Sequence, residues 1–195
     1  SYKYETLIFT KSPFSSWISM LIKQNLKNRS KIHQHPPKIP VTTASTVDTG
    51  VGVTSDPCPE VIGGIPTGAD PSKGCIYLGL LNDYTGPFGP YGIPLETGQR
   101  GFWLWANQTG GVGDYSVAIV EGYDTQYNPQ KHLEGYKAQR GEVAALAMSL
   151  GTPQTQFILD DMDADNMIAA PMSWYSGWSY KGSDRGLVVE FGAAY

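Results

Sequence analysis

Short apolar runs alternate with segments of helical spacing from Cys75 onward, and this alternation constrains the fold more than any other feature of the chain. The apolar runs predict strands at residues 75–81, 115–120, 143–150, 167–170 and 187–191. Helical spacing or helix-start signals predict helices at 94–107, 129–141 and 153–166. Strands that alternate with helices of about 12 residues form βαβ units. We therefore expect an α/β fold with a mostly parallel sheet and helices on both of its faces.

Two of the predicted helices carry the same start signal. Asn128 and Thr152 each precede a proline, and a capping side chain followed by Pro at the first helical position is typical of a helix N-terminus. In this prediction Gly141 ends the first of these helices and Asn166 ends the second.

The two parts of the 195-residue chain carry very different charge. Residues 1–40 hold seven of the 14 Lys and Arg residues and one acid, Glu5, whereas residues 41–195 hold seven basic and seventeen acidic residues, a net charge of −10. We predict that residues 1–40 form a basic extension that is disordered or foreign, and that residues 41–74 form a flexible Thr-, Gly- and Pro-rich tether. Residues 75–195 are then the folded part.

The basic extension has several possible origins. An apolar stretch at 15–22 precedes most of its basic residues, which reverses the order found in a secretory signal peptide. A displaced targeting segment and a basic amphipathic surface helix stay open as alternatives. Because the chain begins at Ser1 rather than at Met, we expect a fragment or a processed form.

The composition argues against several classes of protein. A hydrophobic share of 41% can bury a core, which argues against wholesale disorder. No apolar run reaches the roughly 18 residues that a membrane-spanning helix needs. The net charge of −4 argues against a general nucleic-acid binder. Three histidines and two cysteines leave little for a metal cluster, so we expect neither a metal nor a cofactor.

Cys58 and Cys75 bracket a Pro- and Gly-rich loop. They form either a disulfide or two free thiols, and we favour the disulfide because the tether independently suggests export. A disulfide that closes a loop of this size would stabilise the fold by about 3 kcal/mol. It would also need an oxidising compartment.

Ligands of parallel α/β sheets bind beyond the carboxyl ends of the strands. The predicted strands therefore direct attention to four loops, at residues 82–92, 124–127, 149–153 and 171–180.

These loops carry side chains suited to a small ligand. Ser149 and Thr152 put hydroxyls at a predicted helix N-terminus, which either receives an anion such as a carboxylate or is an ordinary cap. The last loop holds Ser173 with four aromatic residues, among them Trp174, and such a loop either lines a ligand site or forms a surface cluster. Tyr91, on the first loop, can close the same site.

Catalytic and metal-binding motifs are incomplete. His132 lies on a predicted exposed helix, so we expect a solvated surface histidine. The sequence shows no set of Ser, His and Asp that can be recognised as a catalytic triad. The acids of residues 161–165 match the first positions of a calcium loop, but Asn166 stands where that loop needs Gly. The glycines of residues 110–113 precede a strand rather than open a helix, unlike a dinucleotide-binding fingerprint. We therefore expect a protein that is not an enzyme.

Six short segments occur in an order and at a spacing typical of a known family. They are Ile76-Tyr-Leu-Gly-Leu-Leu, Thr85-Gly-Pro-Phe-Gly-Pro-Tyr-Gly92, Asn107 through Gly113, Asp124-Thr-Gln-Tyr-Asn-Pro129, Ser149-Leu-Gly-Thr152 and Ala170-Pro171. No segment is decisive alone. Together they make residues 75–195 resemble the first lobe of periplasmic binding proteins of the Leu/Ile/Val type, the substrate-binding components of branched-chain amino acid ABC transporters.

The resemblance implies a two-lobe domain that closes over its ligand by a hinge motion. In the family, hydroxyls and backbone amides of the first lobe hold the head group of an amino acid. Carried over by motif, the ligand-binding residues are Tyr91, Ser149, Thr152, Ser173 and Trp174. Met172-Ser173-Trp174 departs from the small residues and Thr common after Pro171, so another amino acid, an amide or another small polar solute stays open.

The resemblance also implies partners and a location. An extracytoplasmic protein of this kind delivers its solute to the permease subunits of an ABC transporter and meets the membrane through a lipid anchor, which we expect to be missing from this chain. The tether around Cys58 resembles that of exported lipoproteins. About half of the two-lobe architecture is absent, so we expect this chain alone to bind ligand weakly or not at all. Micromolar amino-acid binding in a calorimetric titration would contradict that expectation.

Two other classes stay open. A ligand-sensing domain of a receptor or regulator uses the same fold and differs in the kind of segment or domain that comes after Tyr195. A small flavodoxin-like α/β enzyme would show a cofactor absorbance after purification, which we do not expect.

Overall fold

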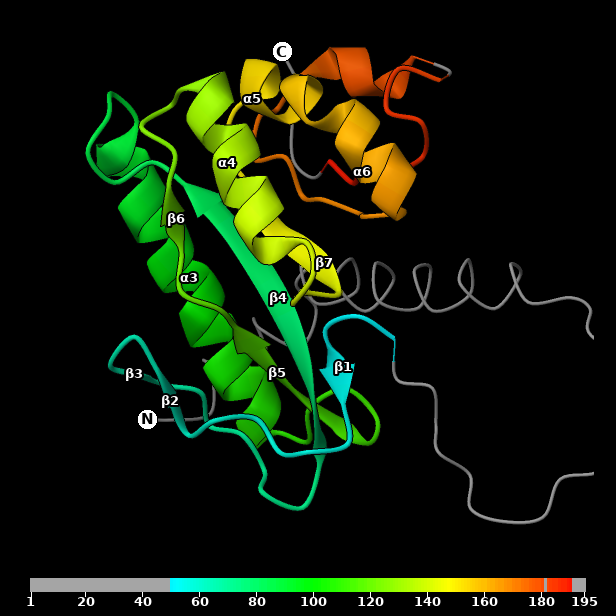
Figure 1. The fold of residues 1–195 in the computed structure, drawn as a ribbon. Helices are drawn as coiled ribbons and strands as arrows, with labels where there is room; N and C mark the ends of the chain where they lie inside the picture. Colours follow the sequence, from blue (N-terminus) through cyan, green and yellow to red (C-terminus); the bar gives the residue numbers. More distant parts are fainter. Residues whose placement is uncertain (1–49, 181, 191–195) are drawn as a thin grey trace, which may run out of the picture.

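The computed structural model describes residues 50–180 and 182–190 (Figure 1). The predicted basic extension at 1–40, the first residues of the predicted tether, and Phe191 at the end of the last predicted strand lie outside the described residues. Within the described part, no helix is long and apolar enough to cross a bilayer.

A five-stranded sheet forms the centre of the fold, and β4 (Gly74–Asn82) is its middle strand. Along one edge of β4, β5 (Tyr115–Ile119) and β6 (Tyr123–Asp124) pair with it in parallel. Along the other edge, β7 (Ala145–Ser149) pairs in parallel and β1 (Val53–Thr54) pairs antiparallel. The sheet is therefore mostly parallel, as the alternation of strands and helices predicts.

Two predicted strands are much shorter in the structure. In place of strands at 167–170 and 187–191, the chain makes single-residue parallel bridges, which join Leu146 to Ala169 and Ala169 to Val188. The backbone hydrogen bonds around these bridges extend the sheet beyond β7. Both segments thus lie beside β7 at one end of the sheet, with less regular pairing than the sequence predicts.

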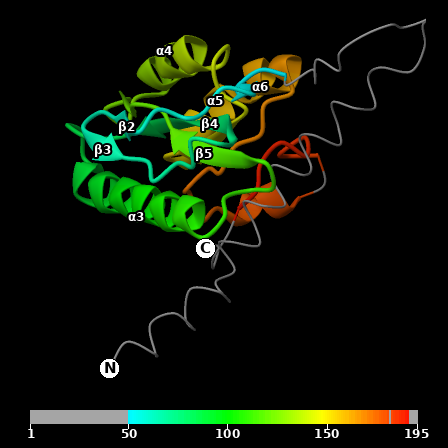
Figure 2. The same cartoon turned by 90° about the horizontal axis from the view of Figure 1, so that it is seen from below.

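Helices cover both faces of the sheet (Figure 2). α3 (Gly89–Gln108) lies on one face. α4 (Pro129–Gln139) lies on the other face, together with α5 (Thr152–Phe157) and α6 (Leu159–Asp165). A short 3-10 helix, Ser176–Ser179, comes near the end of the described chain.

β4 contributes side chains to a core on each face. Ile76 and Leu78 are buried in the cluster that contains Trp103 of α3. Leu81 is buried in a second cluster with Tyr136 of α4. Because residues an even number apart in a strand share a face, odd and even positions of β4 separate between the two clusters. Burial on both faces explains why β4 is an almost continuous apolar run rather than an alternating one.

The helix boundaries differ from the predicted ones in three places. α4 ends at Gln139 with Arg140 as its C-cap, rather than at Gly141. α3 begins at Gly89 with Pro90 in its first turn, so Pro94 lies inside the helix rather than at its start. The single helix predicted at 153–166 is two helices, α5 and α6, with a break at Ile158.

The capping signals hold for two helices and fail for one. The side chain of Asn128 caps α4 by accepting hydrogen bonds from two backbone N–H groups of the first turn, as predicted. Asn166 ends α6 in the left-handed conformation, with φ of 52°. The prediction that Thr152 caps α5 is wrong, because Gly151 holds that position with φ of 106° and Thr152 is the first helical residue. Glycine adopts such a φ without the steric cost that a Cβ brings.

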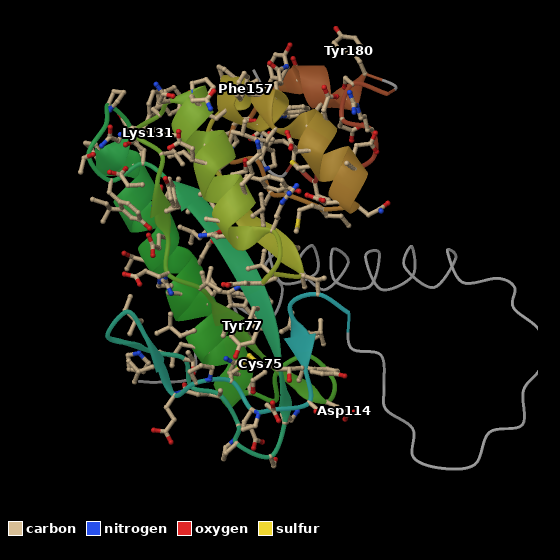
Figure 3. The ribbon with its side chains drawn as sticks, viewed as in Figure 1. Cys75, Tyr77, Asp114, Lys131, Phe157 and Tyr180 are labelled. Atoms are coloured by element: carbon tan, nitrogen blue, oxygen red, sulfur yellow. A yellow bond between two sulfur atoms is a disulfide. The ribbon has the colours of Figure 1, made fainter. Side chains whose placement is uncertain are left out.

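Residues 50–74, assigned from the sequence to the tether, contain regular structure. Besides β1, they form a short hairpin of β2 (Val61–Ile62) and β3 (Ile65–Pro66). A disulfide joins Cys58 to Cys75 near the start of β4 (Figure 3). This bond and the pairing of β1 hold the segment against the sheet, which its composition does not reveal.

Candidate functional site

An open cavity of about 640 Å³ lies beyond the carboxyl ends of β4 and β7. Its lining residues are Phe88, Tyr91, Pro94, Leu95, Tyr127, Leu150, Gly151, Thr152, Met172, Ser173 and Trp174. They come from all four loops that the parallel-sheet rule singles out and from the first turns of α3. Among the described residues, no lining side chain carries a formal charge, and most of the lining is aromatic or aliphatic.

Four of the five predicted ligand-binding residues line this cavity, namely Tyr91, Thr152, Ser173 and Trp174. Tyr91 and Trp174 keep 66% and 37% of their surface exposed, so a ligand can reach both rings. The fifth residue, Ser149, is fully buried and is not among the lining residues. The structure thus brings four of the side chains together and places Ser149 behind the wall.

Ser149 is bonded to two other buried side chains. Its Oγ lies 2.8 Å from His132 Nε2 and 2.7 Å from Thr155 Oγ1. The prediction that His132 is a solvated surface residue is wrong, because its side chain is fully buried. Burial lowers the pKa of His132 to about 3, so the ring is neutral near pH 7.

The composition of the buried side of α4 explains why the sequence wrongly predicts an exposed His132. The buried residues of this helix recur at helical spacing and are His132, Gly135, Tyr136 and Gln139. Two of the four are polar, so a pattern read from hydrophobicity does not mark this side of the helix as the buried one.

Ser173 is also held from inside the protein. Its Oγ accepts a hydrogen bond from Trp178 Nε1–H (2.8 Å) and donates one to Glu190 Oε2 (2.8 Å). Glu190 therefore anchors the loop that carries Ser173. The sequence predicts that Glu190 lies in a strand, and nothing in its pattern indicates this contact.

The buried carboxylate of Asp83 shapes the first loop. It accepts hydrogen bonds from the backbone N–H groups of Gly86 (2.6 Å) and Phe88 (2.7 Å). A Cβ at Gly86 would lie 2.6 Å from Asp83 Oδ1, so only glycine fits at that point of the loop. The loop is thereby folded around Asp83, and Phe88 is presented to the cavity.

Asp124 links the first loop to the second. It accepts hydrogen bonds from the backbone N–H of Tyr84 (2.9 Å) and from the hydroxyl of Thr85 (2.6 Å). Burial acts to raise the pKa of Asp124, but these hydrogen bonds outweigh it and hold the pKa below its usual range. The carboxylate therefore stays ionised and keeps the two loops joined.

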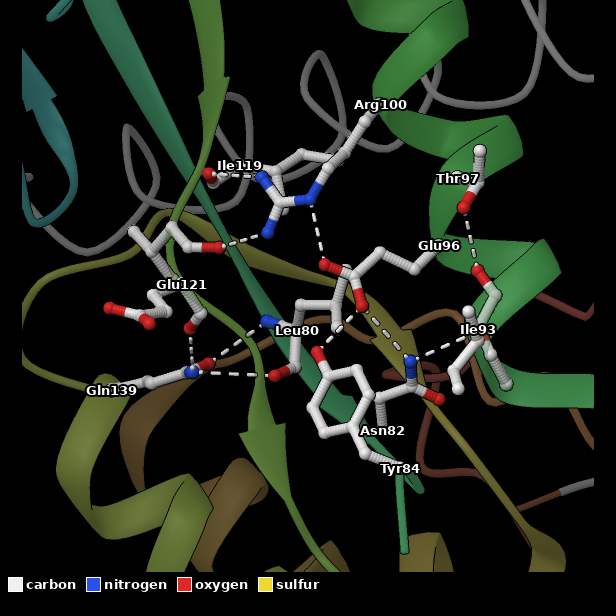
Figure 4. A network of polar contacts seen from close by, with 12 residues as sticks. Leu80, Asn82, Tyr84, Ile93, Glu96, Thr97, Arg100, Ile119, Glu121 and Gln139 are labelled. Carbon is white, nitrogen blue, oxygen red and sulfur yellow. Dashed lines mark hydrogen bonds and ion pairs between the residues drawn. The ribbon is translucent and has the colours of Figure 1, made fainter. Parts of the chain in front are cut away.

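A polar network supports the end of α3 that borders the cavity (Figure 4). Glu96 and Arg100 form an ion pair across one helical turn (2.7 Å), and Arg100 also donates to the carbonyls of Ile119 and Val120. Tyr84 donates to Glu96 Oε2 (2.6 Å). Burial raises the pKa of Tyr84, and the bond to Glu96 raises it further. The network fixes the cavity-bearing turns of α3 against the end of β5.

The lining of the cavity suits a small molecule rather than a metal ion. In residues 50–180 and 182–190, no group of three or more His, Cys, Asp or Glu side chains is placed to hold a metal ion. The cavity instead presents aromatic surface with a few hydroxyls, which is typical of small-molecule sites.

Comparison with known proteins identifies relatives in structure. No protein-family profile matches the sequence, and no curated protein matches it. A fatty acid ABC transporter substrate-binding protein from Thermomonospora curvata has 26% sequence identity and a TM-score of 0.57, over 74% of this chain and 33% of that one.

Two further solved structures are similar in fold. A branched-chain amino acid ABC transporter protein from Thermus thermophilus with bound valine has 17% identity and a TM-score of 0.56, over 64% of this chain and 32% of that one. A branched-chain amino acid transporter substrate-binding protein from Streptococcus pneumoniae in complex with isoleucine has 15% identity and a TM-score of 0.54, over 62% and 34%.

The chain therefore resembles ABC transporter substrate-binding proteins of the Leu/Ile/Val and other types, as the sequence segments predict. Its described part has the α/β fold of a type I periplasmic binding protein lobe. The chain spans about a third of the length of the solved structures that it matches.

Proposed function

We propose that this protein is part of an extracytoplasmic solute-binding protein, which holds a small molecule in the cavity and delivers it to the permease subunits of an ABC transporter. The cavity itself carries the proposal, because it lies at the carboxyl edge of a parallel sheet and is lined from four separate loops. The resemblance to ABC transporter substrate-binding proteins supports the transport role.

The lining favours a solute with a sizeable apolar portion. Phe88, Leu95, Met172 and Trp174 present apolar surface, and each CH₂ group buried there contributes about 0.8 kcal/mol. An amino acid with an apolar side chain, or a similar small solute, fits this lining. Valine, isoleucine and fatty acid, which the names of the three neighbours mention, all have an aliphatic portion.

The lining side chains have separate roles in this proposal. Thr152 and Ser173 make the polar contacts, while Tyr91 and Trp174 cover the apolar portion of the solute. Ser149 makes no contact with the solute, because its hydroxyl is bonded to the buried side chains of His132 and Thr155; it supports the cavity wall from inside the protein.

The proposal also includes that the protein binds its solute without catalysing a reaction, and that it is located outside the cytoplasm. Within residues 50–180 and 182–190, no histidine, cysteine, lysine or carboxylate lines the cavity, so this part of the wall offers no general base or strong nucleophile. The disulfide between Cys58 and Cys75 supports an oxidising compartment. The lipid anchor that the resemblance implies stays a prediction.

The test monitors the indole N–H signals of the five tryptophans by NMR during titration. A Trp174→Phe variant identifies the Trp174 signal. L-valine, L-isoleucine and octanoate are each added to millimolar concentration, since weak binding is expected from this chain alone. We expect the Trp174 signal to move saturably with at least one of them, while the signal of buried Trp103 stays in place.

Two matched variants separate a direct contact from a general effect. Thr152→Val removes a hydroxyl from the cavity wall, and loss of one hydrogen bond corresponds to an affinity about 2- to 12-fold weaker. Thr109→Val removes a hydroxyl at the far end of α3 and leaves the affinity unchanged. Absence of any saturable shift, or an equal loss in both variants, would contradict the proposal.

A further inference from the structure

Three buried side chains from three elements meet behind residues 150–152 of the cavity wall. His132 comes from α4, Ser149 from the end of β7, and Thr155 from α5. All three are fully buried, and none of them lines the cavity. They form an unbroken chain of contacts, 2.8 Å from His132 to Ser149 and 2.7 Å from Ser149 to Thr155.

The direction of the hydrogen bonds is determined by the end of this chain. Thr155 Oγ1 lies 2.8 Å from the carbonyl oxygen of Gly151 and 3.1 Å from that of Ser149. Carbonyl oxygens only accept, so the single hydroxyl hydrogen of Thr155 is directed at them. At the contact between the two hydroxyls, Ser149 must then be the donor.

The direction of the hydrogen bond from Ser149 to Thr155 determines the tautomer of His132. Because the only hydroxyl hydrogen of Ser149 goes to Thr155, Ser149 Oγ can only accept from the histidine. The proton of the neutral ring therefore sits on Nε2. Nδ1 is then an unprotonated acceptor, and it is buried with no hydrogen-bond partner among the residues that the structure describes.

The opposite direction would be unfavourable. With the proton on Nδ1, Ser149 would donate to His132 and Thr155 would donate to Ser149. The Thr155 oxygen would then face the carbonyls of Ser149 and Gly151 with no hydrogen between them. The Gly151 carbonyl would keep only the backbone N–H of Thr155 (3.1 Å), and the lone pairs of the hydroxyl and carbonyl oxygens would face one another, which is unfavourable.

The end of the chain reaches the cavity wall. Gly151, whose carbonyl accepts from Thr155, itself lines the cavity and precedes Thr152. The segment is held from a second side, because Gln154 Nε2 donates to the carbonyl of Tyr127 (2.7 Å). The carbonyl orientation at Gly151 therefore sets where the Thr152 side chain stands.

We propose that His132 is a positioning residue of the cavity. As the neutral Nε2–H tautomer it donates to Ser149, and through Thr155 it fixes the Gly151 carbonyl and the placement of Thr152. It touches no ligand. This inference rests on the proposed function only in so far as Thr152 contacts a ligand.

The tautomer is measured directly by long-range ¹H–¹⁵N correlation of the histidine rings, without any ligand. We expect the proton of His132 on Nε2 in the unchanged protein. Thr155→Val removes the acceptor of the Ser149 hydrogen while keeping the side-chain shape. Ser149 is then free to donate to His132, so we expect the Nδ1–H tautomer to appear. A role in packing alone would not shift this equilibrium.

Variants of His132 test the effect on the wall. His132→Gln places an N–H donor near the position of Nε2 and keeps the Thr152 amide signal in place, whereas His132→Leu displaces it. Gln139→Leu is the matched control, because Gln139 is buried on the same helix and bonds to Leu80 and Glu121 instead. With L-isoleucine as probe, the Trp174 response weakens several-fold in His132→Leu and not in Gln139→Leu.

The outcomes separate this proposal from the proposed function. An Nδ1–H tautomer in the unchanged protein, or an unaltered tautomer in Thr155→Val, overturns the positioning role whether or not a ligand binds. If His132→Leu does not fold, these two tautomer measurements alone test whether His132 has the positioning role. The expected tautomers with no response to any solute would uphold the hydrogen-bond chain and count against the proposed function instead.

Discussion

The ring of Phe88 stacks on the ring of Tyr127, with 4.1 Å between the ring centroids and 26° between the planes. Phe88 comes after β4 and Tyr127 after β6, so the stack joins two loops that are distant in sequence. Both rings line the cavity. One wall of the site is therefore a pair of aromatic residues that support each other.

Replacing Phe88 tests the importance of this stack. Phe88→Ala removes the ring pair, which contributes about 0.5–1.5 kcal/mol beyond burial, and it opens the cavity wall. We expect a loss of stability of about this size in urea unfolding, together with a weaker Trp174 response to L-isoleucine. Phe157→Ala, which removes a half-exposed ring from α5, is the control and leaves the ligand response intact. Equal ligand responses in both variants would contradict the role of the stack.

Gly151 is expected to tolerate no side chain. Its φ of 106° disfavours other residues, and a Cβ there would lie 2.2 Å from Gln154 Oε1. We expect Gly151→Ala to lower the free energy of unfolding by about 1–3 kcal/mol. Gly141→Ala, at a position where a Cβ meets nothing within 4 Å, serves as control and changes stability by less than about 0.5 kcal/mol. Similar losses in both variants, measured by urea unfolding, would refute the requirement at Gly151.

The buried histidine predicts a loss of stability in acid. The pKa of His132 is about 3 in the folded protein, below its value of about 6.5 in the unfolded chain. As pH falls below 6.5 the unfolded chain takes up a proton that the folded protein does not, so stability present above pH 6.5 is lost towards pH 3.

From this group alone, we expect the free energy of unfolding to fall by about 2 kcal/mol between pH 7 and pH 5. Urea unfolding of the protein and of His132→Gln at both pH values measures the contribution. The variant, which lacks the titrating ring, is expected to lose about 2 kcal/mol less over the same interval. Parallel pH profiles for the two proteins would show that His132 does not titrate as its burial implies.

Reduction of the disulfide is expected to destabilise the fold without removing the sheet. Cys58 and Cys75 are 17 residues apart, and closure of a loop of that size contributes about 3 kcal/mol. A Cys58→Ala/Cys75→Ala double variant loses about this amount in urea unfolding, and the loss no longer depends on reductant. An unchanged midpoint after reduction of the original protein would contradict this prediction.

The sequence predicts the architecture well because strand runs and helix starts are local signals. The runs around β4, β5 and β7 identify the parallel strands, and the position of ligands beyond their carboxyl ends identifies all four loops of the cavity. The Asn128 cap is equally local. The predicted strands at 167–170 and 187–191 agree less well with the structure, because the pairing of a strand depends on neighbouring segments that the local pattern does not contain.

The contacts inside the site are not predictable in the same way. His132 is on the buried side of a helix because of the residues opposite it, Ser149 and Thr155, and neither contact is encoded in the local pattern. Phe88 and Tyr127 lie in the predicted loops, but no feature of the sequence indicates that their rings stack on each other. Gly151 replaces Thr152 as cap because the chain turns there with positive φ, which sequence spacing does not show.

A solute that binds between the four loops will shift the backbone amide signals of those loops, so a map of amide shifts over the described chain tests where binding occurs. The protein is saturated with whichever of L-valine, L-isoleucine or octanoate moves the Trp174 signal. We predict that the shifted amides gather in residues 83–92, 124–127, 149–155 and 171–178, while the hairpin of β2 and β3 is unaffected. Shifts centred on the hairpin or on the outer side of α6, or no shifts with any of the three solutes, would contradict binding between the four loops.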